Sequence, residues 1–255
     1  MMPGMETLHL VAVAAVFTLA GGVKGVTGMG LPTVAVSLLG LWMAPAPAAA
    51  LLVAPSLATN VAQCRGPHLR KLVLALWPVW LALAVVTVAA PRLEAGEPPL
   101  RPQWLLGLVL VAYGAWGLWR PTLPALPRRP GGQGAFLSAV ISAAIGAATG
   151  LVTALTAVFV MPLVPYLQAL RLDKDAMVQA LGLSFTVATL ALAIRLQVSG
   201  TLTLVSVPSA VALAAAFAGL GLGTLVRARI SGPAFQRSLF GVFIGLGLAN
   251  LVRGQ

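Results

Sequence analysis

Long apolar stretches, separated by short polar breaks, fill almost the whole chain. Ten such runs occur, at residues 8–23, 31–43, 46–62, 72–90, 104–119, 135–151, 154–170, 176–196, 202–226 and 234–252. A helix that crosses a membrane needs about 20 mostly apolar residues, and several of these runs are shorter than that. The pattern predicts an all-α, polytopic helical membrane protein with about eight spanning helices' worth of chain.

The composition excludes a soluble globular protein. Of the 255 residues, 59% are hydrophobic and only 8% are charged, whereas an ordinary soluble domain has about 25% charged residues. The five acidic residues lie in a tail or between the apolar runs, so no run holds a buried carboxylate. The length leaves no room for a second, soluble domain.

The basic residues indicate the topology of the chain in the membrane. The formal net charge is +11, and three breaks hold three Lys or Arg residues each, at 65–71, 120–129 and 227–237. Cytoplasmic loops of membrane proteins carry such an excess of basic residues, so we assign the charge to topology and expect no nucleic-acid binding. The break at 92–101, with charges of both signs, fits the outside. Counting runs from these breaks places both termini in the periplasm of a bacterial-type inner membrane.

Little in the chain supports catalysis. The single cysteine cannot form an internal disulfide, and two widely spaced histidines cannot form a metal cluster. An intramembrane protease needs a Ser–His or paired-Asp constellation, and lipid-diphosphate enzymes need acidic metal-binding clusters; the sequence contains neither. We therefore expect no enzyme, no metal site and no cofactor. Asp173 and Asp175 flank Lys174 and are typical of a helix start, with Asp173 as the cap.

The chain shows signs of an internal duplication. A shift of 130 residues aligns Pro32 with Pro162, and residues 56–65 with residues 186–195. We predict a first membrane repeat at residues 1–130 and a second at residues 131–255, each with five apolar pieces. An odd number of crossings makes such a repeat inverted. Each half begins with a short pair of runs, of which the 13- to 17-residue pieces cover only about 20 to 26 Å as helix. We expect these pairs to be broken or re-entrant.

The most informative segment is residues 21–32, GGVKGVTGMGLP. Five glycines and a proline in twelve residues break a helix and free backbone N–H groups, which a membrane tolerates only beside protein or a polar cavity. Interrupted segments at matching places in two halves are typical of a transporter's binding site. Lys24 and Thr27 would supply a cation and a hydroxyl there. Two alternatives remain: glycines that serve helix packing, and a Lys24 that extends to the lipid headgroups.

The counterpart in the second half is residues 146–156, GAATGLVTALT, followed by Pro162 and Tyr166. Thr149, Thr153 and Thr156 lie three or four residues apart, so they can share one helix face. They could line a site, although such hydroxyls can equally bond the carbonyls of the preceding helical turn.

Polar side chains also mark the third run of each half. Asn60 and Gln63 end the first of these runs, where they either join helices or line a path. Gln179 and Ser184 lie along its repeat partner and suit a joining role. Arg195, which ends that partner, suits an interfacial anchor.

These segments resemble those of one known family, the sulfite exporter TauE/SafE family of membrane permeases. The likeness lies in residues 24–32, KGVTGMGLP, in Asn60 and Gln63 downstream, and in residues 150–174, which contain YLQALRLDK. With the duplicated layout it covers nearly the whole chain. Many members have a more glycine-rich second break than residues 146–156 show. The resemblance implies a multipass inner-membrane permease for small anions, typically sulfite or organosulfonates.

We therefore expect a permease or exporter that carries small anions by alternating access, with sulfite, sulfonates or related organosulfur anions as leading substrates. A permease for a neutral or cationic solute is one alternative, although acidic lining for a cation is absent. A non-transporting membrane scaffold is another, although it would have no reason to pair broken, polar segments. Expected partners are the anion and membrane lipid. The candidate substrate-binding residues are Lys24, Gly25, Thr27, Gly28, Gly30, Asn60, Gln63, Thr149, Thr153, Thr156 and Tyr166. We expect Lys24, Thr27, Asn60 and the surroundings of Thr153 to meet in one polar cavity.

Overall fold

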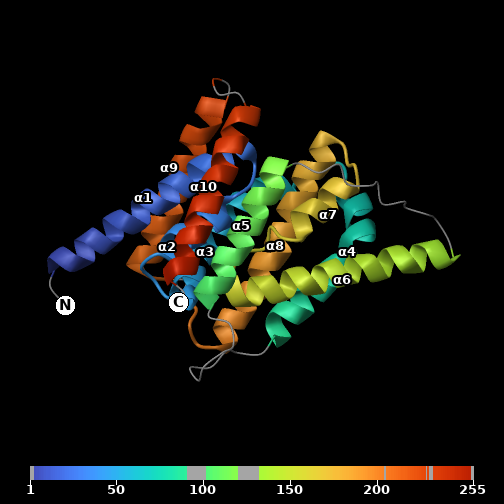
Figure 1. The fold of residues 1–255 in the computed structure, drawn as a ribbon, viewed down its shortest axis with the longest axis horizontal. Coiled ribbons are helices and arrows are strands. Elements are labelled where there is room, and N and C mark those ends of the chain that lie inside the picture. Colours follow the sequence, from blue (N-terminus) through green and yellow to red (C-terminus); the bar gives the residue numbers. More distant parts are fainter. Residues whose placement is uncertain are drawn as a thin grey trace.

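A computed structural model describes residues 3–90, 102–119, 132–203, 205–227, 229 and 232–253. These residues form ten helices and no strand (Figure 1). The helices are α1 (Pro3–Thr27), α2 (Leu31–Leu39), α3 (Pro45–Cys64), α4 (Leu69–Ala89), α5 (Pro102–Trp119), α6 (Gly132–Thr156), α7 (Leu163–Ala169), α8 (Lys174–Val198), α9 (Val207–Arg227) and α10 (Gly232–Arg253). Each predicted apolar run overlaps at least one of them, which confirms the all-α class.

Seven of the described helices are long and apolar enough to cross a membrane, namely α1, α3, α4, α6, α8, α9 and α10. Large apolar side chains such as Leu74 and Trp77 on α4 are exposed on the outside of the bundle, where lipid would cover them. The short helices lie inside, since eight of the nine residues of α2 and six of the seven of α7 are buried. The protein is therefore a multi-pass membrane protein.

The first helix break is shorter than predicted. α1 continues to Thr27, so Lys24 lies inside a helix, and only residues 28–30 separate α1 from α2. Gly28 and Gly30 have φ angles of 80° and 99°, in the left-handed region that glycine adopts without steric cost. The prediction of a break over residues 21–32 was wrong in its extent, because the earlier glycines serve helix packing.

The second helix break lies elsewhere than predicted. α6 continues without interruption to Thr156, so residues 146–156 are helix, and the prediction of a break there was wrong. The chain leaves the helix at Ala157, with a φ angle of 56°, and resumes at α7 after Pro162. The residues between them, 158–160, are buried in the core. A proline disfavours helical geometry in the residue before it, and this places the break just before Pro162.

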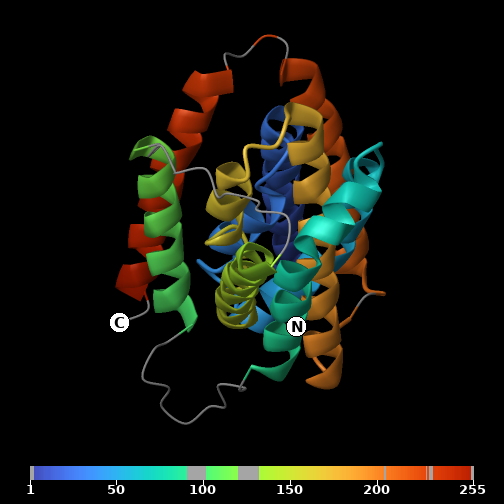
Figure 2. The same ribbon diagram turned by 90° about the vertical axis from the view of Figure 1, so that its right-hand side faces the viewer.

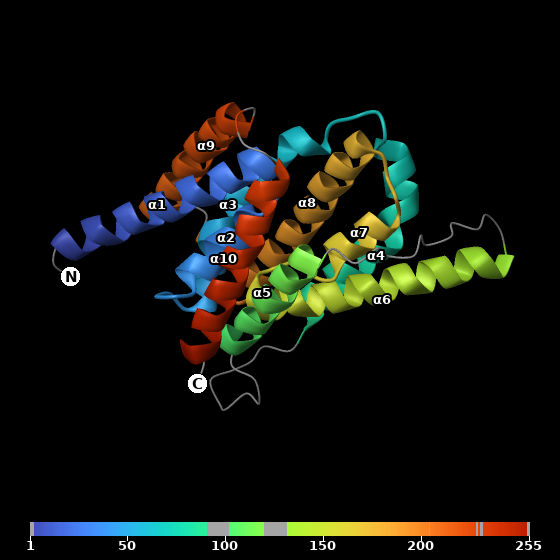
Figure 3. The ribbon, with the colours of Figure 1, turned by 45° about the horizontal axis from the view of Figure 1, so that its top comes forward.

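The long helices pair across the two halves of the sequence. α1 packs against α9, α4 against α6, α5 against α10, and α3 against α8; Figures 2 and 3 show the α5–α10 and α1–α9 pairs. α1 and α9 run parallel, because Gly21 faces Ala216 and Gly25 faces Thr224. The first helix of each half thus packs against the third long helix of the other half. An inverted duplication would produce this pattern, and the repeats at residues 1–130 and 131–255 stay a prediction.

Glycines allow two of these pairs to approach closely. A Cβ atom on Gly25 would lie 2.5 Å from the Leu220 carbonyl oxygen of α9. A Cβ atom on Gly150 would lie 2.6 Å from the Leu83 carbonyl oxygen of α4. Real Cβ atoms do not approach this closely, so both positions require glycine. The packing interpretation of the glycines four residues apart on α1 and α6 is confirmed.

Contacts at the helix ends show which connections between helices lie on the same side of the bundle. The ends of α1, α3 and α9 lie together, since Gln63 bonds the Gly28 carbonyl and Gly25 faces Thr224. The basic stretches after α3 and α9 therefore share one side, as predicted. The start of α1 and the end of α10 lie on the opposite side. That this side is the periplasm stays a prediction, and the breaks at 92–101 and 120–129 lie outside the described residues.

Candidate functional site

Lys24, in the last turn of α1, is almost completely buried, with 2% of its surface exposed. Its ammonium Nζ donates to Thr59 Oγ1 at 3.0 Å and to Asn60 Oδ1, both on α3. Among the described residues it has no carboxylate partner. Burial removes most of the hydration of an ammonium, and two neutral oxygens replace only part of it. The surroundings of Lys24 therefore favour an anion.

The face of α3 that meets Lys24 carries two further polar groups. In the part of the chain that the structure describes, Asn60 Nδ2 and Ser56 Oγ have no hydrogen-bond partner, and each residue is 1% exposed. Thr59 donates its hydroxyl to the Pro55 carbonyl at 2.7 Å, so it accepts from Lys24. Buried polar groups normally have partners, and an amide NH2 and a hydroxyl can both donate to an anion. We call Lys24, Ser56, Thr59 and Asn60 the Lys24 cluster.

Side chains from α1 and α3 hold the first break in place. Gln63 Nε2 donates to the Gly28 carbonyl at 2.6 Å, while Gln63 Oε1 has no partner among the described residues. The Thr27 hydroxyl lies 2.8 Å from the Val23 carbonyl and 2.7 Å from the Met29 carbonyl, and it accepts the Met29 N–H at 3.2 Å. Thr27 therefore stabilises the break through its backbone contacts.

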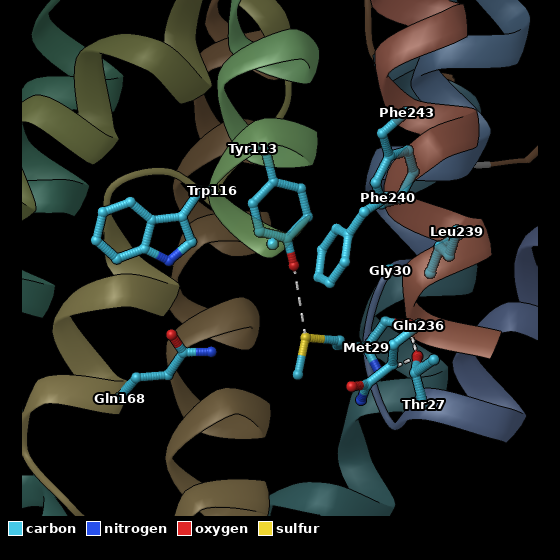
Figure 4. A pocket seen from close by; sticks show the side chains of 11 residues that line it. Thr27, Met29, Gly30, Tyr113, Trp116, Gln168, Gln236, Leu239, Phe240 and Phe243 are labelled. Atoms are coloured by element: carbon cyan, nitrogen blue, oxygen red, sulfur yellow. Dashed lines mark hydrogen bonds between the residues drawn. The ribbon is translucent and has the colours of Figure 1, made fainter. Parts of the chain in front are cut away.

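A cavity of about 280 Å³ borders the first break, and we call it the break cavity (Figure 4). The Tyr113 hydroxyl donates to the Met29 sulfur at 3.7 Å, and the Tyr113 ring contacts Phe240 and Phe243 at centroid distances of 5.4 and 5.6 Å. The cavity thus combines aromatic walls with a few polar groups. Its lining residues are Thr27, Met29, Gly30, Tyr113, Trp116, Gly117, Gln168, Gln236, Leu239, Phe240 and Phe243.

The predicted single polar cavity forms only in part. Lys24 and Asn60 are in contact, and Thr27 lines the break cavity one helical turn further on. Lys24 itself does not line that cavity. Thr153 lines a different cavity of about 420 Å³, together with Arg195. The prediction that Thr153 joins the other three residues was wrong, because its helix ends near the opposite side of the bundle.

The two cavities lie toward opposite ends of α5. Pro102, the first residue of that helix, lines the Thr153 cavity, and Trp116 lines the break cavity. Fourteen residues of α-helix separate them, which corresponds to about 21 Å. The break cavity lies on the side of the basic stretches after α3 and α9.

The other predicted residues of the second half make contacts within the bundle. Thr149, Thr153 and Thr156 each donate to the carbonyl oxygen four residues earlier, at 2.8, 2.7 and 2.7 Å. This is the alternative in which the hydroxyls bond the preceding turn. The hydroxyls of Tyr166 and Ser142 lie 2.7 Å apart and join α7 to α6. A role of these residues in substrate binding stays a prediction.

The polar residues expected to join helices do so. Gln179 Nε2 on α8 donates to the carbonyls of Cys64 and Gly66 at 3.0 and 3.1 Å. Ser184 Oγ accepts a hydrogen bond from Trp80 Nε1 at 2.9 Å. These contacts hold α8 against α3 and α4.

Charged residues lie at helix ends as predicted. The Asp173 carboxylate accepts the Ala176 N–H at 2.8 Å and caps α8. This hydrogen bond lowers the pKa of the Asp173 carboxyl below its ordinary value. At the other end of α8, an Arg195 guanidinium N–H donates to the Ala90 carbonyl at 2.7 Å, after the last turn of α4. A cation there also complements the negative end of the α4 dipole.

Sequence reasoning missed several residues that line the break cavity. Tyr113 and Trp116 lie three residues apart, so they share one helix face, and both carry a polar group on an aromatic ring. Two such residues on one face of an apolar run could have indicated that this face lines a cavity. Gln168 lies inside the YLQALRLDK segment and was not selected. Ser56, in the Lys24 cluster, was aligned in the repeat but not proposed as a site residue.

Comparison with known proteins identifies the family. A family model described as Sulfite exporter TauE/SafE matches residues 13–250 of the 255-residue chain. Searches of curated proteins and of solved structures gave no match. The matched region contains both helix breaks, the Lys24 cluster and the residues of both cavities. Because the match covers nearly the whole chain, the protein belongs to the sulfite exporter TauE/SafE family.

Proposed function

We propose that the protein is a permease of the inner membrane that carries a small anion, with the Lys24 cluster as the anion site. The family name refers to the export of sulfite. The observation that carries the proposal is the buried ammonium of Lys24, which has no carboxylate partner among the described residues. Asn60 Nδ2 beside it, and Ser56 Oγ one helical turn earlier on α3, have no hydrogen-bond partner among the described residues. Cation and hydrogen-bond donors together suit an oxyanion.

The electrostatic gain from an anion at this site is large. A charge pair 4 Å apart at an effective dielectric constant near 20 contributes about 4 kcal/mol, before the cost of desolvation. A cationic solute would be repelled by the same amount, and a neutral solute would leave the ammonium uncompensated. The charge of Lys24 therefore favours an anion over both alternatives.

The arrangement of the two cavities supports alternating access. Thr27, Met29 and Gly30 of the first break line the break cavity, whereas Lys24 lies one helical turn before Thr27 and does not line it. The Thr153 cavity lies toward the other end of α5. In the mechanism we propose, the break moves away from α3, the Gln63–Gly28 hydrogen bond opens, and the Lys24 cluster becomes accessible from the break cavity.

Sulfite and alkylsulfonates are the substrates we propose first. Each offers several acceptor oxygens around one centre, and the cluster offers donors from Lys24, Asn60 and Ser56. A flux assay with sulfite, alkylsulfonates and carboxylates on the reconstituted protein would rank these classes. Faster transport of carboxylates than of the sulfur anions would overturn the substrate assignment while leaving the anion site in place.

Charge reversal at Lys24 tests the site itself. We expect Lys24→Glu to abolish transport, Lys24→Ala to reduce it by at least tenfold, and Lys24→Arg to retain part of it. A net loss of about 1.4 kcal/mol already lowers affinity about tenfold. Lys71→Glu, a charge reversal at an exposed lysine on α4, is the matched control. A folded Lys24→Glu protein that transports its anion at the wild-type rate would refute the proposal.

A further inference from the structure

An open apolar groove separates α10 from α1, α2 and α9. Its volume is about 750 Å³, and its walls are almost entirely apolar, with Ala15, Gly22, Gly223, Phe235 and Val242 among them. Figure 2 shows α9 and α10 diverging from their connection. Because α1, α9 and α10 are long enough to cross the membrane, the groove faces the hydrocarbon region and not water.

The length of the groove matches one leaflet of a bilayer. On α1 it extends from Ala15 to Val26, and on α10 from Phe235 to Leu246. Eleven residues of helix cover about 17 Å, which is close to half of the roughly 30 Å hydrocarbon core. One end of the groove lies at the ends of α1 and α9, beside the basic stretch at 227–237. The groove therefore covers the leaflet on the side of that stretch.

Three exposed arginines lie at this end of the groove. Arg227 follows the groove residue Val226, and the Arg229 N–H donates to the Val226 carbonyl at 2.8 Å. Arg237 lies between the groove residues Phe235 and Ser238. All three arginines are exposed, and the sequence from residue 205 to residue 253 contains no acidic residue to compensate them. This end of the groove is therefore strongly basic.

We propose that the groove binds one acyl chain of an anionic phospholipid, with the lipid phosphate among Arg227, Arg229 and Arg237. The apolar walls suit the chain, and the arginines suit the headgroup by charge. A basic residue near the membrane surface strengthens binding of an anionic lipid about fivefold. Leu239 lines both this groove and the break cavity, so the bound chain packs against the outer side of that cavity's wall. The lipid thereby supports α10 beside the α1–α2 hairpin.

Native mass spectrometry of the full-length protein in detergent tests the headgroup contact. The protein is titrated with phosphatidylglycerol and with phosphatidylcholine carrying the same acyl chains. We expect one phosphatidylglycerol to bind at least tenfold more tightly than phosphatidylcholine. Replacing Arg227, Arg229 and Arg237 together by Gln removes this preference. The matched control replaces three other exposed basic residues, Arg65 between α3 and α4 and Arg70 and Lys71 in the first turn of α4, by Gln and leaves the preference intact.

Filling the groove tests the position of the acyl chain. Ala15→Phe places a ring in the groove from an exposed position. We expect it to weaken the binding of both phosphatidylglycerol and phosphatidylcholine at least tenfold. The control is Ala148→Phe, at an exposed position on α6 that does not line the groove. We expect it to leave the affinities for both lipids unchanged. Equal binding of the two lipids by the wild type, equal effects of the two triple variants, or unchanged lipid binding by Ala15→Phe would overturn the proposal. A protein dimer that only Ala15→Phe dissociates would also overturn it, in favour of a second copy as the occupant.

Discussion

The two helix breaks follow the first helix of each half, yet their surroundings differ. The break at residues 28–30 uses two glycines in the left-handed region, borders a cavity, and lies one turn from the buried Lys24. In the break at residues 157–162, the side chains of residues 158–160 are at most 1% exposed and belong to the apolar core. The architecture is similar in both halves, whereas among the described residues a buried cation lies beside the first break only.

Equivalent positions in the two halves show how the difference arises. The 130-residue shift pairs Thr59 with Thr189, and each hydroxyl donates at 2.7 Å to the carbonyl four residues earlier. The same shift pairs Asn60 with Leu190, which is 47% exposed, and Lys24 with Ala154. Hydroxyl bonds within a helix are therefore a common structural feature of both halves. The candidate anion site depends on Lys24 and Asn60, whose equivalents in the second half are the apolar residues Ala154 and Leu190.

Asn60 offers the largest expected effect after Lys24 itself. Asn60→Asp would place a carboxylate beside the Lys24 ammonium, and this internal ion pair would compete with the substrate anion. We expect transport to fall by more than tenfold. Asn60→Leu introduces the residue found at position 190 and removes a hydrogen-bonding side chain. Because a hydrogen bond contributes about 1 kcal/mol, we expect transport to fall about fivefold. Flux assays on variants with unchanged melting temperatures check this order, which the opposite ranking would contradict.

The close glycine contacts are expected to matter equally in both halves. Gly25→Val and Gly150→Val would each force a side chain against a backbone carbonyl, at 2.5 and 2.6 Å for the Cβ atom alone. Overpacking of this kind costs about 1 to 3 kcal/mol, and equilibrium unfolding in detergent measures it. Gly245→Val is the control, because a Cβ atom there meets no atom within 4 Å. Stability unaffected by Gly150→Val would show that the α4–α6 contact is looser than the α1–α9 contact.

Thr59 and Thr189, which the 130-residue shift pairs, allow the two halves to be compared through a single hydroxyl group. Thr59→Val removes an acceptor of the Lys24 ammonium, so we expect about a fivefold loss of transport, as a hydrogen bond near 1 kcal/mol implies. Thr189→Val removes an equivalent hydroxyl that donates only to the preceding turn, and we expect little change in transport. Parallel flux assays and melting temperatures separate the two effects. Similar transport losses from both variants would mean that the hydroxyls act only on helix stability.

The starts of α3 and α8 differ in a way that predicts the smallest effect. α3 begins at Pro45 without a side-chain cap, whereas Asp173 caps α8. Asp173→Ala is expected to lower the melting temperature slightly, while Asp173→Asn, which can also cap, retains it. The lowered pKa of Asp173 means that the carboxylate stabilises the helix start above the ordinary aspartate pKa and loses this effect as the pH falls through the lowered value. Melting curves between neutral and acidic pH check this. A difference in melting temperature between the wild-type protein and the Asp173→Ala variant that does not change with pH would contradict it.

Several features followed from the sequence because they depend on local chemistry. A bilayer requires each crossing segment to satisfy its own backbone hydrogen bonds, so apolar runs become helices, and each of the ten runs overlaps at least one helix. The N-cap role of Asp173 is local as well. Lys24 and Asn60 were recognisable because polar side chains are costly within such runs, although their contact, 36 residues apart in sequence, was only an expectation.

The tertiary structure decided which polar groups meet and which are satisfied within their own helix. A glycine can break a helix or let two helices approach, and only the partner helix distinguishes these roles: Gly28 bends the chain, while Gly25 packs on α9. A threonine likewise looks the same in sequence whether its hydroxyl faces a ligand or a carbonyl of its own helix, so the separation of Thr153 from Lys24 could not be foreseen. The break cavity draws Tyr113, Gln168 and Gln236 from three helices. Such a cavity is set by how the helices cross, and the hydrophobic periodicity of one helix contains no information on the distance to another.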